Sequence, residues 1–234
     1  MQILFDAGLI LLGYLIGSIP FGLIIVKLKT GKDIRQVESG RTGGTNALRA
    51  AGFWAGLGTA LLDIFKGTVA AWIALALTDN SLIHVLAPIG AVLGHNYSAY
   101  LPEFDENGKF KRLSGGAGGG PVAGGALGLW PEAGLIVILV GTLVFFGLGY
   151  ASMTTISVGV TATIIFAVRA WLGYSPWEYV LYGVLAVIIL LWALRPNLKK
   201  LANGTERVIS ISLHGRIKAK NEKVSAEEAA HDLE

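Results

Sequence analysis

The sequence predicts an all-α, polytopic membrane protein with about seven transmembrane helices, some of them short or broken by Gly and Pro. Hydrophobic residues make up 53% of the 234 residues and charged residues 15%, and the mean hydropathy is +0.60. A soluble domain carries about 25% charged residues. Several uncharged stretches approach the roughly 20 residues that a helix needs to cross a hydrocarbon core. Because the chain has no cysteine, it has no disulfides, thiolate catalysis or cysteine-based zinc sites.

Each of the apolar segments is expected to form a helix. The fourth segment is dense in glycine and proline, which favours a broken or re-entrant helix. The uncharged stretch 133–168 is too long for one crossing and is expected to turn near residues 149–154. Five spans plus two short ones is the alternative. The segments are 5–26, 53–77, 82–100, 114–129, 133–150, 155–172 and 177–194.

The positive charges predict the orientation. Lysine and arginine concentrate at residues 27–49, at 109–112 and from Arg195 onward, whereas the alternate connections have none. The positive-inside rule therefore places the amino terminus outside and the basic loops in the cytoplasm. Attraction to anionic lipid headgroups accounts for the basic pI of about 9.1 without nucleic acid. Residues 1–208 are expected to form one membrane domain, and 209–234 a polar cytoplasmic tail.

The first basic connection contains a glycine-rich loop between Ser39 and Arg49. Glycine lets backbone N–H groups approach an oxyanion, hydroxyls add donors, and arginine offers a bidentate fork for phosphate. This composition favours binding of a phosphorylated substrate over mere helix packing. The candidate residues are Ser39, Arg41, Gly43, Gly44, Thr45, Asn46 and Arg49.

Three ionisable residues are expected in or beside the membrane. Asp63 and Lys66 lie three residues apart and share a helical face. Charges at that depth are costly unless they are paired or face a wet cavity. His95 follows a glycine near the end of the third segment. An ion pair that fixes helix packing and a histidine that caps a helix remain alternatives to a supporting role beside a polar cavity.

Further polar or glycine-rich groups are expected on the same side of the membrane. A glycine run aims backbone amides at a phosphate or a developing oxyanion. Hydroxyls at the predicted inner turn, together with an amide and a carboxylate after the last span, complete a polar pocket, although each alone is equally well a helix cap. These residues are Gly115, Gly116, Gly118, Ser152, Thr155, Asn197 and Glu206.

The motifs, in their order, resemble the PlsY family of acyl-phosphate-dependent glycerol-3-phosphate acyltransferases over residues 8–208. The matching elements are Gly-Ser-Ile-Pro-Phe-Gly at 17–22, Asp-Ile-Arg at 33–35, Ser39-Gly40 with Gly44-Thr45-Asn46 and Arg49, Leu62-Asp63 with Lys66-Gly67, Gly94-His95, the Tyr-x-Ser of 150–152, and Asn197 leading to Gly204-Thr205-Glu206.

The resemblance implies a seven-helix enzyme of the bacterial inner membrane whose active site faces the cytoplasm. Its activity is transfer of a fatty acyl group from acyl phosphate to the 1-hydroxyl of sn-glycerol 3-phosphate, which gives lysophosphatidate and phosphate in the first step of phospholipid synthesis. No metal or cofactor is implied, and a homodimer is neither implied nor excluded. By position, Ser39, Arg49, Ser152, Thr155 and Asn197 are the catalytic candidates, and Asp63, Lys66, His95 and Glu206 support them.

This chain departs from the family pattern at several positions. Both lysines of the family's second motif, Phe-Lys-Gly-Gly-Lys-Gly, are missing from the aligned stretch 113–118, and an insertion of about ten residues precedes it. Arg41 replaces an asparagine, and Leu194 replaces a histidine. Loss of cationic stabilisation costs on the order of 3 kcal/mol of barrier lowering. We therefore expect Arg41, Lys111 or Arg112 to supply the positive charge.

Three alternatives remain open. A diverged paralogue would use another acyl donor or acceptor. A non-catalytic protein would bind phospholipid or phosphate. An anion transporter would need a polar path across the bilayer, whereas the charged and glycine-rich loops lie almost entirely on one predicted side. With no cysteine and no serine–histidine–acid set evident, direct acyl transfer without a covalent intermediate is expected, and no side chain stands out as a general base.

Overall fold

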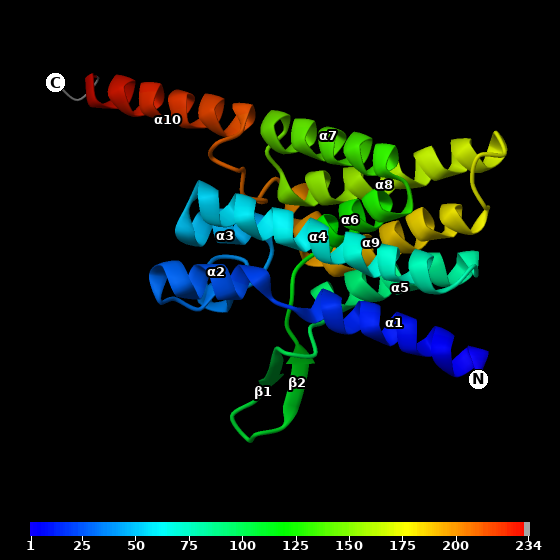
Figure 1. Ribbon diagram of the computed structural model, residues 1–234. Coiled ribbons are helices and arrows are strands. Elements are labelled where there is room, and N and C mark those ends of the chain that lie inside the picture. The colour runs from blue at the N-terminus through cyan, green and yellow to red at the C-terminus, as the bar shows by residue number, and fades with distance from the viewer. Residues whose placement is uncertain (232–234) are drawn as a thin grey trace.

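The computed structural model describes residues 1–231, which form a bundle of apolar helices with one two-stranded ribbon. The long helices run side by side, the ribbon leaves the bundle sideways, and the last helix extends away from it (Figure 1). The elements are α1 (Gln2–Ser18), α2 (Phe21–Thr30), the 3-10 turn Ile34–Gln36, α3 (Gly44–Ala51), α4 (Phe53–Leu77), α5 (Ser81–Asn96), β1 (Pro102–Phe104), β2 (Phe110–Leu113), α6 (Gly119–Leu129), α7 (Pro131–Gly147), α8 (Ala151–Trp171), α9 (Glu178–Ala202) and α10 (Leu213–His231).

Each of the predicted apolar segments contains a helix, which confirms the all-α membrane class. The first segment is interrupted between α1 and α2, at Ile19 and Pro20, because proline removes a helical donor. The turn predicted near 149–154 lies between α7 and α8. Four segments of the described chain are long and apolar enough to cross a bilayer, and α5 and α7 are shorter. The number of crossings therefore stays a prediction.

The fourth segment is short, as its glycine content predicts. Residues 114–118 are not helical, and α6 has only 11 residues, which span about 16 Å, or half of a hydrocarbon core. Its glycines allow close packing on α4. A Cβ at Gly124 would lie 1.9 Å from the carbonyl oxygen of Ile64. Figure 1 shows α6 in the middle of the bundle, behind α4.

Small residues also join α1 to α5. A Cβ at Gly17 would lie 2.1 Å from the carbonyl oxygen of Ala91, and one at Gly13 would lie 2.2 Å from that of Ala87. Close backbone approach through small residues is the usual packing of membrane helices. Gly17 of the Gly-Ser-Ile-Pro-Phe-Gly element therefore serves packing.

The chain after α9 returns to the bundle before α10 begins. The Ile209 N–H donates to the Gly149 carbonyl over 2.7 Å, and Ile209 and Ser212 are buried. Residues 209–212 thus pack against the α7–α8 turn, and α10 begins at Leu213. The division into a membrane domain up to residue 208 and a polar tail from 209 stays a prediction.

Candidate active site

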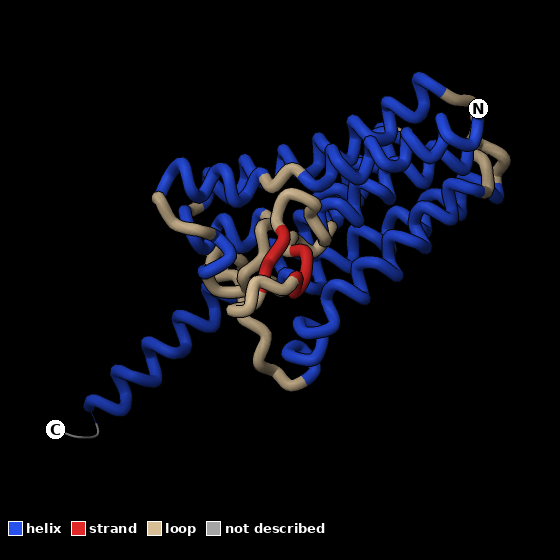
Figure 2. The backbone as a smooth tube through the Cα atoms, turned by 90° about the horizontal axis from the view of Figure 1, so that it is seen from below, coloured by secondary structure: helices blue, strands red, loops and turns tan. Residues whose placement is uncertain are grey.

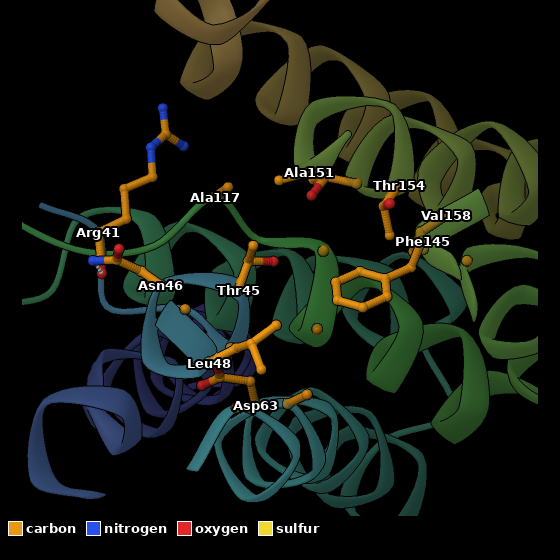
Figure 3. Close-up of a pocket in the computed structure, with 18 of the residues that line it drawn as sticks. Arg41, Thr45, Asn46, Leu48, Asp63, Ala117, Phe145, Ala151, Thr154 and Val158 are labelled. Atoms are coloured by element: carbon orange, nitrogen blue, oxygen red, sulfur yellow. Dashed lines mark hydrogen bonds between the residues drawn. The ribbon is translucent and has the colours of Figure 1, made fainter. Parts of the chain in front are cut away.

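A cavity of about 400 Å³ opens among α3, α4, the start of α6, and the adjoining ends of α7, α8 and α9. Figure 3 shows that the labelled polar residues Arg41, Asn46 and Thr45 lie on one side of it and Phe145 and Val158 on the other. Most of the predicted site residues meet here. Those that line the cavity are Ser39, Arg41, Gly43, Gly44, Thr45, Asn46, Arg49, Asp63, His95, Gly118, Thr155 and Asn197.

Asn46 organises the glycine-rich loop. Its Nδ2 donates to the carbonyl oxygens of Ile34, Val37 and Arg41 over 3.2, 2.9 and 2.8 Å. These bonds draw the loop around the start of α3, and they occupy the amide donors that were expected to contact phosphate. Backbone N–H groups at the start of α3 and the Thr45 side chain remain on the cavity wall.

Arg41 carries a buried charge at the cavity. Its Nη2 donates to the Ala193 carbonyl over 2.6 Å and to Asn197 Oδ1 over 3.1 Å. Its Nη1 is buried and has no hydrogen-bond partner within the described residues. Burial lowers the pKa of Arg41 from its usual value. A guanidinium in this state is stabilised by an anion that enters the cavity.

Arg49 is a second cation on the same wall. It lies in the last turn of α3, its Nη2 is 3.5 Å from the Arg207 carbonyl, and burial lowers its pKa as well. Arg207 in turn forms an ion pair with Glu38. Arg207, in the segment after α9, is thus attached both to α3, through Arg49, and to Glu38, just before the glycine-rich loop.

Asp63, Lys66 and His95 form a buried cluster behind and along the cavity wall. Lys66 Nζ lies 2.9 Å from Asp63 Oδ1 and 2.8 Å from His95 Nδ1, and it donates to the Ile19 carbonyl over 3.0 Å. Each of the three side chains is at most 4% exposed. Asp63 and Lys66 form the expected ion pair, and Asp63 and His95 also line the cavity, so a supporting role for them stays a prediction.

The contacts of His95 with the charged pair both use Nδ1, which lies 2.8 Å from Lys66 Nζ and 3.4 Å from Asp63 Oδ1. The other ring nitrogen, Nε2, points toward the glycine-rich loops. Nε2 lies beside the glycines of both loops, since a Cβ at Gly43 would be 3.9 Å from it and one at Gly116 only 1.9 Å. His95 therefore joins the two glycine-rich walls.

The second glycine run packs on His95 before it reaches the cavity. The Gly116 N–H donates to the His95 carbonyl over 2.8 Å, and the Thr42 N–H donates to the Gly115 carbonyl over 3.2 Å. Gly115 and Gly116 therefore connect the walls without lining the cavity. Gly118, Gly119 and Gly120 do line it, and they place the N-terminus of α6 at the cavity wall. A helix N-terminus has free N–H groups that suit an anion.

Ser152 and Glu206 meet away from the cavity. Ser152 Oγ donates to Glu206 Oε2 over 2.5 Å, the Ser152 N–H donates to Oε1 over 3.3 Å, and Asn197 Nδ2 donates to the same Oε1 over 3.5 Å. Ser152 is fully buried and is not among the residues that line the cavity. This pair holds the segment after α9 against α8, and it orients Asn197 toward Arg41.

Lys111 and Arg112 do not line the cavity. Both lie on β2, which leaves the bundle sideways (Figure 1), and Arg112 pairs with Glu103 over 2.6 Å. Of the three proposed replacement cations, Arg41 is thus the one that the fold brings to the site.

The other half of the cavity is apolar and was not predicted from the sequence. Its wall is formed by α4, α7 and α8 and includes Ile64, Ile138, Phe145 and Val158. Phe146 also lines it and is 43% exposed. The apolar half therefore forms a groove that runs from the charged end of the cavity to an exposed aromatic ring on α7. Thr154, next to the predicted Thr155, is a further polar lining residue that was missed.

The fold and this cavity together define a class of protein. It is a multi-pass membrane protein with a cavity that is lined by Arg41 and Arg49 at one end and by apolar side chains at the other.

Comparison with known proteins gives the family. Residues 7–204 match the sequence model described as Glycerol-3-phosphate acyltransferase, and the chain belongs to this family. The glycerol-3-phosphate acyltransferase of Syntrophomonas wolfei is 35% identical over 88% of this chain and 97% of its own length. A glycerol-3-phosphate acyltransferase of Thermus thermophilus is 37% identical over 85% of this chain and 92% of its own length.

A solved structure has the same fold. The crystal structure of PlsY (YgiH), an integral membrane glycerol 3-phosphate acyltransferase, in its glycerol 3-phosphate form, superposes with a TM-score of 0.73 at 29% identity, covering 87% of this chain and 95% of that one. Its lysophosphatidic acid form gives a TM-score of 0.71 at 27% identity over 88% and 96%.

Proposed function

We propose that this protein transfers a fatty acyl group from acyl phosphate to the 1-hydroxyl of sn-glycerol 3-phosphate, forming lysophosphatidate and inorganic phosphate. The observation that carries this proposal is the shape of one cavity, which joins two arginines, Arg41 and Arg49, to an apolar groove. Both substrates carry a phosphate, and one carries a long apolar chain. The family membership and the solved relative with glycerol 3-phosphate support the same conclusion.

The cations and helix ends suggest how two phosphates are held. Arg41 approaches from the first loop and contacts the last turns of α9, whereas Arg49 approaches from α3. The N-terminus of α6 adds backbone N–H groups between the polar and apolar halves. We assign this helix start and Thr155 to the acyl phosphate, because the apolar groove begins beside them. The glycine-rich loop and Arg49 are assigned to glycerol 3-phosphate.

The reaction is a direct transfer. The hydroxyl oxygen of glycerol 3-phosphate attacks the acyl carbon, the bond from that carbon to the phosphate oxygen breaks, and the hydroxyl proton passes to the departing phosphate. Alignment of the two substrates lowers the barrier by about 7–11 kcal/mol in well-oriented cases. Exclusion of water strengthens the attraction between the arginines and the developing charge. Ser39 and Asn197 complete the proposed catalytic set as hydrogen-bonding groups on the cavity wall.

The membrane context follows from the charge pattern. The loops that carry Arg41 and Arg49, the start of α6 and the chain after α9 lie at one end of the bundle (Figure 1). We propose that this end faces the cytoplasm, which its lysine and arginine content supports. We also propose that the membrane is a bacterial inner membrane, which agrees with the organisms of the relatives. Residues 1–208 would then carry the activity, and 209–234 would form the cytoplasmic tail.

The proposal is tested with purified protein reconstituted in a lipid mesophase. Phosphate release is followed with palmitoyl phosphate and glycerol 3-phosphate, and acyl-CoA and acyl carrier protein thioesters serve as alternative donors. Release that requires both palmitoyl phosphate and glycerol 3-phosphate is expected. Turnover with thioesters alone would show that acyl phosphate is not the donor. Saturable binding of palmitoyl phosphate or glycerol 3-phosphate without turnover would identify a non-catalytic binding protein.

A further inference from the structure

The ribbon formed by β1 and β2 has two chemically different faces. The strands are antiparallel, with Glu103 opposite Arg112 and Phe104 opposite Phe110, and a β-bulge between the two pairs leaves Lys111 as the extra residue on β2. Residues opposite each other share a face, and the adjacent residues Glu103 and Phe104 point to opposite faces. Glu103 and Arg112 form an ion pair on one face, over 2.6 Å. Phe104 and Phe110 form an edge-to-face aromatic pair with ring centroids 6.4 Å apart. The ribbon is therefore amphipathic.

The aromatic face is uncovered within the described chain. The exposed fractions of Phe104 and Phe110 are 59% and 61%. An isolated two-stranded hairpin is at best marginally stable in water, and stability requires a hydrophobic face packed on a partner. The turn itself is well formed, because Asp105 Oδ1 accepts from the backbone N–H groups of Asn107 and Lys109, each over 2.9 Å. An exposed aromatic pair on a two-stranded ribbon therefore suits contact with an apolar surface.

The root of the ribbon is tied to the inner end of α1. Ser98 Oγ donates to the Ser18 carbonyl over 2.6 Å, and the Ala99 N–H donates to Ser18 Oγ over 3.3 Å. α1 has 17 residues, so Ser18 lies about 25 Å from its start, close to the inner edge of a hydrocarbon core of about 30 Å. α2 continues the apolar segment to Thr30, beyond this level. The ribbon thus emerges at the depth where acyl chains meet headgroups.

The direction of the ribbon agrees with this depth. In Figure 1 it leaves the bundle across the helix axes, and in Figure 2, seen from below, it projects toward the viewer from the half of the bundle that carries α10. A segment that leaves a membrane helix at right angles, at the level of the interface, runs along the bilayer surface.

The residues beside the aromatic pair suit a lipid interface. Lys109 and Lys111 flank Phe110 and are exposed, and Tyr100, close to the root, is 54% exposed. Aromatic rings at the headgroup level with lysines alongside are typical of interfacial anchors, because the rings insert among the lipids and the lysines are attracted to anionic headgroups. The acidic groups are engaged elsewhere, Glu103 with Arg112 and Asp105 with the turn, whereas Glu106 remains exposed at the tip.

We propose that the β1–β2 ribbon is a membrane-interface anchor. Phe104 and Phe110 insert at the boundary between headgroups and acyl chains, and Lys109 and Lys111 contact the phosphates of anionic phospholipids. The ribbon is also joined to the cavity wall, since Ser114, the first residue of the second glycine run, donates to Glu103. The anchor therefore holds the first residues of the second glycine run at a fixed depth in the bilayer.

The chain has no cysteine, so a single environment-sensitive label reports on one position. Phe110→Cys is labelled with a fluorophore in vesicles that contain phosphatidylglycerol, with Leu139→Cys on the lipid-facing surface of α7 and Lys218→Cys on α10 as controls. The label at 110 is expected to be shielded several-fold from aqueous iodide relative to that at 218, and to be quenched by lipids spin-labelled near the headgroup more than by deeper ones. If iodide quenches the label at 110 as strongly as the label at 218, the proposal is overturned. The aromatic face would then be a binding surface for a soluble protein partner.

A second measurement tests the headgroup contact and does not depend on catalysis. Lys109→Gln/Lys111→Gln, in the labelled protein, is expected to reduce lipid quenching at position 110 in phosphatidylglycerol vesicles and to leave it unchanged in phosphatidylcholine vesicles. Equal quenching with and without the lysines in phosphatidylglycerol would contradict the role of anionic lipid. Unchanged quenching at Leu139→Cys in the same background shows that the bundle is intact.

Discussion

Arg41 Nη2 lies 3.1 Å from Asn197 Oδ1, although 156 residues separate the two in the chain. The contact joins the first glycine-rich loop to the last turns of α9, and it sets a buried cation at the polar end of the cavity. Asn197 is held in turn by Glu206, which accepts from Ser152. The site is therefore assembled from the two ends of the membrane domain.

Arg41 is expected to be required for turnover. Arg41→Ala removes a buried positive charge from the cavity wall, and the loss of one such group costs about 3 kcal/mol in barrier, a hundredfold or more in kcat/KM. Arg41→Lys should retain part of the activity, because lysine keeps the positive charge but lacks the bidentate guanidinium group. Steady-state phosphate release measures both variants. Arg195→Ala, whose guanidinium stacks on Trp192, is the matched control, and equal kcat/KM for Arg41→Ala and Arg195→Ala would contradict the assignment.

Lys111 and Arg112 are expected to contribute little to the chemistry in detergent. Lys111→Ala/Arg112→Ala changes the ribbon and leaves the cavity wall intact, because neither residue lines it. The phosphate-release rate at saturating substrate should stay within about twofold, since surface substitutions usually have small effects. A hundredfold loss would place these cations in the reaction after all, and would remove the special role of Arg41.

Gly116 is expected to tolerate no side chain. A Cβ there would lie 1.9 Å from His95 Nε2, and the contact of His95 Nδ1 with Lys66 over 2.8 Å holds the ring in place. Overpacking of this kind costs about 1–3 kcal/mol. Gly116→Ala should lower the unfolding temperature in detergent and the turnover together. Gly8→Ala is the control, because nothing lies within 4 Å of a Cβ at that position and alanine favours a helix. A stable and active Gly116→Ala would mean that the two glycine-rich walls are not held as described.

The Asp63–Lys66 pair yields a prediction about stability. Lys66→Met leaves the buried Asp63 carboxylate without its cation, and breaking a buried pair costs about 3–5 kcal/mol. Asp63→Asn/Lys66→Met removes both charges and should recover much of that loss. Thermal unfolding in detergent compares the two variants with the wild type. If the double variant is no more stable than Lys66→Met, the pair does not act as a unit.

Part of the site was predictable because its residue types report their chemistry locally. Glycine, hydroxyl and arginine in the loop 39–49 predict an anion site wherever the loop lies. The lysines and arginines of the basic loops predict that these loops lie on the same side of the membrane. The roles of Asn46 and Ser152 were not predictable, because an amide or a hydroxyl serves a loop carbonyl, a carboxylate or a substrate equally well. The structure shows Asn46 holding its own loop and Ser152 holding Glu206.

Composition and hydropathy alone determined that this chain belongs in a bilayer, and the glycine-rich, basic loops predicted an anion site at one end. Both inferences depend on residue types that are close together in the chain. Only the tertiary structure decided which cation reaches the cavity. Arg41 reaches the cavity because its loop packs against the last turns of α9, whereas Lys111 and Arg112 lie on a ribbon that leaves the bundle. Contacts between residues far apart in the chain depend on how helices pack, and no local pattern encodes that choice.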